Sequence, residues 1–294
     1  MRWPIRLEIM YAERLSSWLR RIGIYYGLTI EDLLKDLGFE GLKANQIDIR
    51  APGLLAKEIR ERTGLSLEVI RTTTISGLLS ASLLRDTAVA RAQYRDISVL
   101  SRPYRLQSRR RWIRWIRREG QSRTHACRLC LDEYPNASLL LPWALSIVFS
   151  CPTHEVLLEP VEVRRKQLIW QNEGSEKAPE LIMQLDRRTW SALCEGYVRL
   201  PGGIIGDEHW FRVLQTIFHE LEAPGLSDMK WQQIIRQEAG FLARAPGENF
   251  IFDIREAKLI ATAIDQIEKG RVEAMGKDGH WFMSKASLAA EQRE

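Results

Sequence analysis

Three cysteines and one histidine form the most chemically specific pattern in this sequence. Their spacing is Cys127-x2-Cys130-x20-Cys151-x2-His154, which is two short pairs separated by a loop of moderate length. Each pair forms a turn that can aim two ligands at one point, and two such turns complete the tetrahedral coordination that Zn²⁺ prefers. Because four protein ligands leave no position for a substrate, we expect one structural Zn²⁺ ion rather than a catalytic one.

Two further side chains near this pattern could bind a metal, and neither has the right spacing. His125 precedes the first pair by two residues, which suits a neighbour of the site better than a ligand. Cys194 stands alone in an apolar stretch, which is typical of a buried thiol. The expected ligand set is therefore the three cysteines and one histidine alone.

A dense block of arginines precedes the cysteines. Residues 101–123 hold nine arginines and one glutamate, a net charge of +8, so the remainder of the +5 chain carries −3. Such a block is typical of a segment that contacts the phosphates of DNA or RNA, although a solvated connector can have the same composition. The interleaved Trp112 and Trp115 could stack on bases, but they fit a small core better. The arginines expected to contact phosphate are Arg109, Arg110, Arg111, Arg114, Arg117 and Arg118.

The common enzyme motifs are missing from the sequence. It contains no phosphate-binding loop of the G-x4-G-K-[ST] type, no G-x-G-x-x-G fingerprint and no G-x-S-x-G nucleophile elbow. His209 and His219 are too far apart to share one helical face, and the acidic residues form no recognisable nuclease triad. We therefore expect a binding or adaptor protein and not an enzyme.

The composition and the N-terminal residues indicate where the protein works. No apolar run reaches the about 18 residues that a membrane helix needs, and the first residues lack the apolar core of a secretion signal. We expect the protein in the bacterial cytoplasm, associated with the nucleoid and not with a membrane. In that reducing compartment, cysteines are more often metal ligands or free thiols than disulfides.

The first part of the chain must position these groups, and its periodicity is helical. Apolar residues in 12–26 recur at the spacing of a half-buried helix, and Thr29 with Asp32 can cap the next one. A helix over 54–62, a turn at Thr63-Gly64-Leu65 and a second helix over 67–72 capped by Ser66 have the helix-turn-helix pattern. Few side chains suited to contact base edges lie on the second helix. The pattern is therefore stronger evidence for a helix-turn-helix shape than for sequence-specific DNA recognition.

The last part is also predicted to be mainly helical. Helices are expected over 207–221, 228–237 and 254–267, after a linker over 164–180 and a turn at Pro201-Gly202-Gly203. The predicted fold is mainly α, with three domains. These are a helix-turn-helix-like domain over 1–120 that ends in the arginines, a zinc-finger unit over 121–165 and a helical domain over 166–294, for which a winged helix is one candidate form.

Several stretches together resemble the TniQ family. The run ERLSSWLRRI over 13–22 resembles the family's start. The family's Cys-x2-Cys-Leu, central tryptophan and Cys-x2-His-x3-Leu element is similar to residues 127–131, Trp143 and residues 151–158. Residues 199–214 resemble a leucine-proline-glycine and tryptophan-phenylalanine segment of some members. Many relatives carry a further cysteine pair directly afterwards, but residues 159–163 contain none, which argues against a second zinc ion.

The resemblance implies an adaptor that selects the target of a transposon. Such members connect a targeting module to an AAA+ ATPase of the TniB/TnsC type, which recruits the transposase to the target DNA. Short members associate with a CRISPR effector such as Cascade, in which a guide RNA reads the sequence, and longer TnsD-like members bind an attachment site directly. The short chain and its poor recognition helix favour a member that takes its target from a CRISPR effector. The N-terminal domain is expected to dock on a partner or on a second copy of itself, as a homodimer. The rival hypothesis from another class is a free-standing, sequence-specific DNA-binding regulator.

Overall fold

The computed structural model describes residues 2–4, 7–78, 124–133, 138–145, 147–164, 167–170, 174–207, 209–211, 213–214, 217, 235, 237–240 and 254–269. The arginine block at 101–123 lies outside these residues. So do both predicted domain boundaries, at 120/121 and at 165/166, which therefore stay predictions. Among the described residues, no helix combines the length and the apolar composition needed to cross a membrane.

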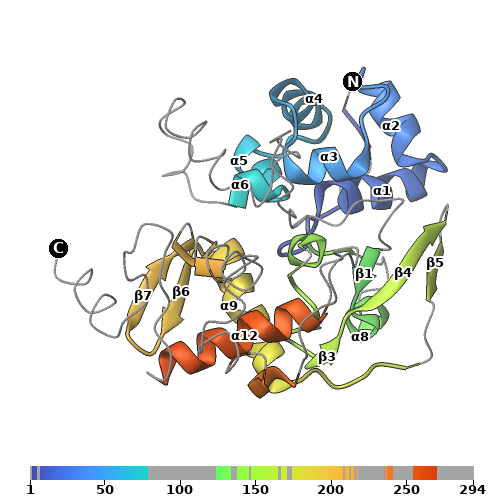
Figure 1. Cartoon of the computed structure of the whole chain (residues 1–294). Coiled ribbons are helices and arrows are strands. Elements are labelled where there is room, and N and C mark those ends of the chain that lie inside the picture. Colours follow the sequence, from blue (N-terminus) through green and yellow to red (C-terminus); the bar gives the residue numbers. More distant parts are fainter. Residues whose placement is uncertain are drawn as a thin grey trace, which may run out of the picture.

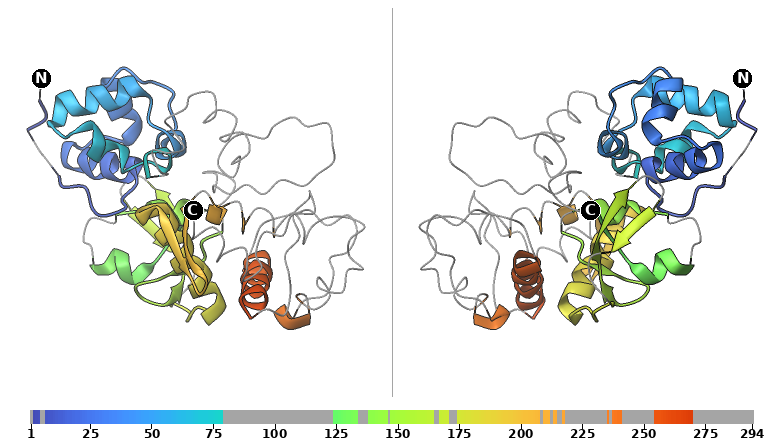
Figure 2. Two further views of the ribbon diagram at one scale, coloured as in Figure 1. Left: turned by 90° about the vertical axis from the view of Figure 1, so that its left-hand side faces the viewer. Right: turned by 90° about the vertical axis from the view of Figure 1, so that its right-hand side faces the viewer.

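The described chain is mainly helical, as the sequence predicts, with small antiparallel sheets in its centre (Figure 1). Up to residue 78, the described N-terminal layer consists of six helices: α1 Leu15–Tyr26, α2 Ile30–Asp36, α3 Ala44–Ile49, α4 Gly53–Thr63, α5 Leu67–Arg71 and α6 Ile75–Leu78. In two side views this layer lies next to the central strands and away from α12 (Figure 2).

Helix α1 follows from its apolar stripe and its end signal. Leu15, Trp18, Leu19 and Ile22 recur on one face, and each is almost completely buried. Gly27 ends the helix in the left-handed conformation at φ +71°, which glycine adopts without steric cost. The helix predicted over 12–26 is therefore confirmed, apart from its first turn.

The next helix begins with the predicted cap. The Asp32 N–H donates to Thr29 Oγ1 at 3.1 Å, and the Thr29 N–H donates to the Asp32 carboxylate at 3.0 Å. This reciprocal pair satisfies two backbone donors that a helix start otherwise leaves without partners. Helix α3, in contrast, has a weak local pattern and was not predicted.

The predicted helix-turn-helix shape is confirmed. Helix α4 ends at Gly64, whose φ of +79° turns the chain, and Ser66 caps α5 by accepting from the Val69 N–H at 3.2 Å. Ile59 and Ile70 are fully buried and hold the two helices together. Helix α5 is only five residues long, and its first turn presents Glu68.

The centre and the last part of the chain alternate short strands with helices. Their bounds are β1 Thr124–Ala126, α8 Arg128–Glu133, the 3₁₀ turn η2 Leu141–Ala144, β2 Ser150–Cys151, β3 Val156–Leu157, β4 Glu159–Arg164, β5 Gln167–Trp170, α9 Glu180–Glu195, β6 Tyr197–Leu200, β7 Gly203–Gly206 and α12 Ile254–Glu268. The sheets are antiparallel, with strand orders β1-β4-β5, β2-β3 and β6-β7. Helix α12 confirms the helix predicted over 254–267.

The linker predicted over 164–180 is wrong in part. Its residues 167–170 form β5, which pairs back onto β4 with Val161 opposite Trp170 and Arg164 opposite Gln167. A hairpin between strands of mixed polarity depends on backbone hydrogen bonds, and these leave little trace in the pattern of side chains. The predicted turn at residues 201–203 is confirmed as the connection of β6 to β7.

Two hydrophobic cores organise the part of the chain that the structure describes. One lies within the N-terminal layer around Trp18 and Ile47. The other is continuous from the cysteine region, around Trp143, to the C-terminal helices α9 and α12, and it also receives Ile75 of α6. The cysteine region and the C-terminal helices therefore bury their apolar side chains together.

A buried ion pair lies where the N-terminal layer meets the centre. The Glu13 carboxylate is fully buried and accepts from Arg21 Nε at 2.8 Å and from Arg21 Nη2 at 2.6 Å. It also accepts from the Ser17 hydroxyl at 3.2 Å and the Met10 N–H at 3.0 Å. Paired, planar donors of this kind are what allow a carboxylate to be removed from water.

Residues 12–17 and 139–141 form a joint between the two parts. The Leu139 N–H donates to Ser17 Oγ at 2.8 Å, the Arg14 N–H donates to Leu139 O at 2.9 Å, and the Leu141 N–H donates to Ala12 O at 2.7 Å. Ala12 has φ +56°, a conformation that costs a non-glycine residue about 1–2 kcal/mol. The bond from the Leu141 N–H to Ala12 O and the bond from the Arg14 N–H to Leu139 O hold this residue in that conformation.

Replacing Glu13 should destabilise the protein strongly. Glu13→Gln keeps the size of the side chain but leaves the Arg21 charge buried without a counterion, so we expect a loss of about 3–5 kcal/mol in the free energy of unfolding. Urea denaturation of the full chain measures it. The matched control is Glu40→Gln, which breaks the exposed ion pair with Lys35 and should cost less than about 1 kcal/mol. Equal losses for both variants would contradict the assigned role of Glu13.

Candidate metal centre

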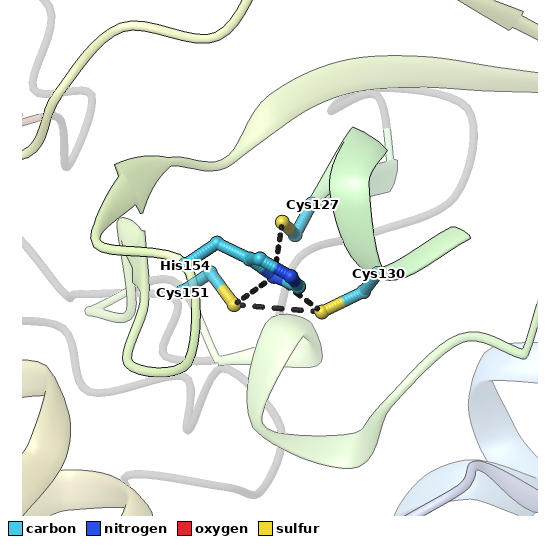
Figure 3. Close-up of side chains that lie close together, drawn as sticks. All are labelled: Cys127, Cys130, Cys151 and His154. Atoms are coloured by element: carbon cyan, nitrogen blue, oxygen red, sulfur yellow. Dashed lines mark hydrogen bonds between the residues drawn. The ribbon is translucent and has the colours of Figure 1, made fainter. Parts of the chain in front are cut away.

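The four predicted ligands come together in the structure. Their ligand atoms all lie within 4.8 Å of one another, and the side chains point toward a common centre (Figure 3). The His154 Nδ1 atom lies 3.5 Å from Cys127 Sγ, 3.2 Å from Cys130 Sγ and 3.7 Å from Cys151 Sγ. The Cys130 and Cys151 sulfurs are 3.5 Å apart.

The four separations given above, 3.2–3.7 Å, are close to those of a tetrahedral site. With Zn–S bonds of about 2.3 Å and Zn–N bonds of about 2.0–2.1 Å, ligand atoms at tetrahedral angles are about 3.5–3.8 Å apart. Three sulfurs and one imidazole nitrogen are also the donor set that structural zinc takes. The buried cluster of Cys127, Cys130, Cys151 and His154 could therefore hold a metal ion.

The first knuckle, residues 127–130, is fixed by a strand before it and a helix within it. Cys127 follows β1, and Cys130 lies in α8. Between them, the Arg128 guanidinium lies 3.4 Å from the buried Glu159 carboxylate and 4.8 Å from the centre of the Trp170 ring. The β4–β5 hairpin thus stabilises the first knuckle through Arg128, which is not itself a metal ligand.

The second knuckle, residues 151–154, is the turn of the β2–β3 hairpin. The Glu155 N–H donates to Cys151 O at 2.8 Å, and Glu155 has φ +57°. From α9, the Asp186 carboxylate accepts from the Phe149 N–H at 3.0 Å and from both the N–H and the hydroxyl of Ser150 at 2.6 Å. Asp186 is fully buried, so these bonds fix the strand that leads into Cys151.

The electrostatics of the cluster favour a cation at its centre. Hydrogen bonds from the Cys127 and Cys130 thiols lower the pKa of the Cys151 thiol to about 2. Contact with the Cys127 and Cys151 thiols, together with burial, raises the pKa of Cys130. Without a cation the cluster therefore favours one thiolate, whereas a bound Zn²⁺ ion would hold all three cysteines as thiolates.

The two side chains judged unsuitable from their spacing lie outside this cluster. Cys194 is half-buried in α9, and burial raises the pKa of its thiol to about 12. His125 lies on β1 opposite Pro160. Within the described residues, the group that could hold a metal contains neither of them.

Glu133 and Asp186 support the cluster and were not identified from the sequence. Glu133 Oε1 lies 3.0 Å from His154 Nε2, and this hydrogen bond raises the pKa of His154. Glu133 follows Cys130 by three residues, a spacing that is informative only once the knuckle is known to be helical. Asp186 is 36 residues from Ser150 and leaves no local signal.

The predicted phosphate contacts cannot be placed in this geometry. Arg109, Arg110, Arg111, Arg114, Arg117 and Arg118 all lie outside the described residues. Their assignment rests on charge alone and stays a prediction.

A family model matches a large part of the chain. The TniQ model matches residues 4–158, more than half of the 294 residues. The match includes the joint residues, the helix-turn-helix and all four cluster residues, and it ends directly after β3. No curated protein and no solved structure matches the chain.

Purified protein should contain one equivalent of zinc per chain. Cys151→Ala removes one of four ligands and should reduce the zinc content to below half an equivalent, with loss of folded structure, because binding of a structural metal is coupled to folding. Elemental analysis and circular dichroism measure the two effects. Cys194→Ser is the matched control, since it changes a cysteine outside the cluster and should retain the metal. A Cys151→Ala protein that stays folded without a change in metal content would refute the assignment.

Proposed function

Because the chain belongs to the TniQ family, whose members are transposition-associated target-selection proteins and generally non-catalytic, we propose that it is a non-enzymatic adaptor in DNA transposition. In this role it connects a target-recognition module to an AAA+ ATPase of the TniB/TnsC type, and the ATPase recruits the transposase. The match over residues 4–158 is the observation that carries this proposal.

The cysteine–histidine cluster supports a structural role within that adaptor. Three sulfurs and one nitrogen would saturate a Zn²⁺ ion, so no coordination position would remain for a substrate or a reactive water. The residues Cys127, Cys130, Cys151 and His154 would hold one zinc ion. That ion would link the two knuckles. The segment between the knuckles contains residues 139–141, which form the joint with the N-terminal layer.

The targeting module that we propose is an RNA-guided CRISPR complex of the Cascade type. Helix α5 supports this choice, because a helix of five residues that begins with Leu67 and Glu68 presents little that reads base edges. An adaptor with this helix needs its sequence specificity from a partner, such as a guide RNA. The adaptor would act on target DNA in the bacterial cytoplasm, as a monomer or as a homodimer.

The arginine block is proposed to contact nucleic-acid phosphates beside the target. Its charge of +8 stands out because the remainder of the chain is mildly acidic. Contacts of this kind add affinity without sequence preference, which suits an adaptor whose target is chosen elsewhere.

The alternative is a protein that reads DNA by itself, either a free-standing regulator or a TnsD-like attachment-site binder. The confirmed helix-turn-helix of α4 and α5 favours it, since this shape commonly enters the major groove. Arg71 is exposed on α5 and would be its most suitable base or phosphate contact.

The adaptor should bring the ATPase and the RNA-guided complex together. In a pull-down on the tagged effector complex, we expect the ATPase to be retained only when the full-length chain is present. The control omits the chain, and a second control omits the guide RNA to test whether a loaded effector is required. If the chain binds neither the effector complex nor the ATPase in this experiment, the adaptor proposal is refuted.

DNA binding by the protein alone should be weak, salt-dependent and insensitive to sequence. Replacing the six named arginines by glutamine should reduce the slope of log K against log salt by up to about 5, because each phosphate contact contributes about 0.9. Titrations of random and selected DNA at several salt concentrations measure this. The matched variant Arg71→Gln should leave binding unchanged. Tight binding to a selected sequence that is lost in Arg71→Gln would favour the regulator instead.

A further inference from the structure

The imidazole of His154 is held at both of its nitrogens. Its Nδ1 faces the three cysteine sulfurs, the nearest of which is Cys130 Sγ at 3.2 Å. Its Nε2 lies 3.0 Å from the Glu133 carboxylate on the opposite side of the ring. Cys130 and Glu133 are one helical turn apart in α8, so a single short helix contacts both ends of this ring.

This geometry selects one tautomer of His154. An imidazole that coordinates through Nδ1 must carry its proton on Nε2, and the Glu133 carboxylate accepts a hydrogen bond from that N–H. A fixed ring with a carboxylate partner is a better ligand, because its orientation is set in advance and its basicity is raised. We propose that Glu133 is a positioning residue that orients His154 and slows the release of the metal, an inference that rests on the proposed zinc centre.

The exposure of the two side chains says how Glu133 acts. The carboxylate is 58% exposed and the imidazole 15% exposed. A hydrogen bond that is as open to water as this one contributes little to folding stability by itself. The contribution of Glu133 should therefore be seen in metal retention and much less in the stability of the surrounding helix.

The neighbouring Asp132 provides a matched control. It is also exposed, it precedes Glu133 in the same helix, and it has the same charge. Asp132→Asn therefore removes one negative charge near the metal without removing the partner of His154. Comparison of the two positions separates orientation of the ring from general electrostatic attraction of the cation.

The test measures zinc itself in the full-length protein. In Glu133→Ala, the transfer of zinc to a chromophoric chelator should be about tenfold faster than in the wild type. The affinity of the protein for zinc should be about tenfold weaker, since loss of an outer-shell partner weakens metal binding by about 10–100-fold. Glu133→Gln keeps an acceptor oxygen and should lie between Glu133→Ala and the wild type. Asp132→Asn should match the wild type.

Two spectroscopic readouts report on the ring directly. Long-range ¹H–¹⁵N NMR should show Nδ1 bound to the metal and Nε2 protonated in the wild type, with faster solvent exchange of the Nε2 proton in Glu133→Ala. The visible bands of the cobalt-substituted protein should shift in Glu133→Ala and stay unchanged in Asp132→Asn.

The outcomes separate this inference from the metal centre itself. A wild-type protein that binds zinc, with Glu133→Ala and Asp132→Asn indistinguishable in release rate and in spectra, would overturn the role of Glu133 and leave the zinc centre intact. A wild-type protein without zinc would overturn both.

Discussion

The structure depends on one buried carboxylate, that of Glu13, at the start of the first long helix. Charge without water is tolerated only when it is paired, and Arg21 with the Ser17 hydroxyl supplies that pairing. The same Ser17 oxygen accepts a hydrogen bond from the Leu139 N–H. Ser17 therefore connects the buried ion pair to the bond that attaches the helices to the cysteine region. The ERLSSWL run that resembles the family's start is thus explained by structure. Ser16 binds the Asp48 carboxylate and Trp18 donates to Leu7 O, so contacts within the fold also account for these two members of the run.

The cluster depends in a similar way on residues distant in sequence. The first knuckle is held through Arg128 by the β4–β5 hairpin, and the second is held by Asp186 of α9. Both supports come from beyond residue 158, where the family match ends. The C-terminal helices share their hydrophobic core with the cysteine region. The matched residues and those that follow them are consequently parts of one packed structure.

Local features of this fold could be predicted from the sequence, and distant pairings could not. The stripe of α1, the Thr29 cap, the turn at Gly64 and each of the two ligand pairs, Cys127 with Cys130 and Cys151 with His154, are encoded within a few residues of chain. Strand β5 depends on backbone hydrogen bonds, and the support by Asp186 depends on partners that are distant in sequence. Neither produces a periodic pattern of side chains that could be recognised in the sequence. Glu133 lies between these cases, because its spacing from Cys130 has meaning only on a helix. The phosphate contacts of the arginine block stay a prediction, since charge indicates a partner without indicating geometry.

The bond between Ser17 and Leu139 spans 122 residues of chain, which affects the order in which the protein is assembled. Contacts at such separation require closure of a long loop and form slowly, whereas the helices before residue 78 are built on local contacts. During synthesis, the N-terminal helices can therefore fold well before their docking surface has a counterpart. The hydrogen bonds by which Asp186 supports the second knuckle can form only after a further stretch of chain has been made. Docking of the N-terminal helices needs less of the chain, because the Ala12 carbonyl gains the Leu141 N–H as soon as residues 139–141 have been made.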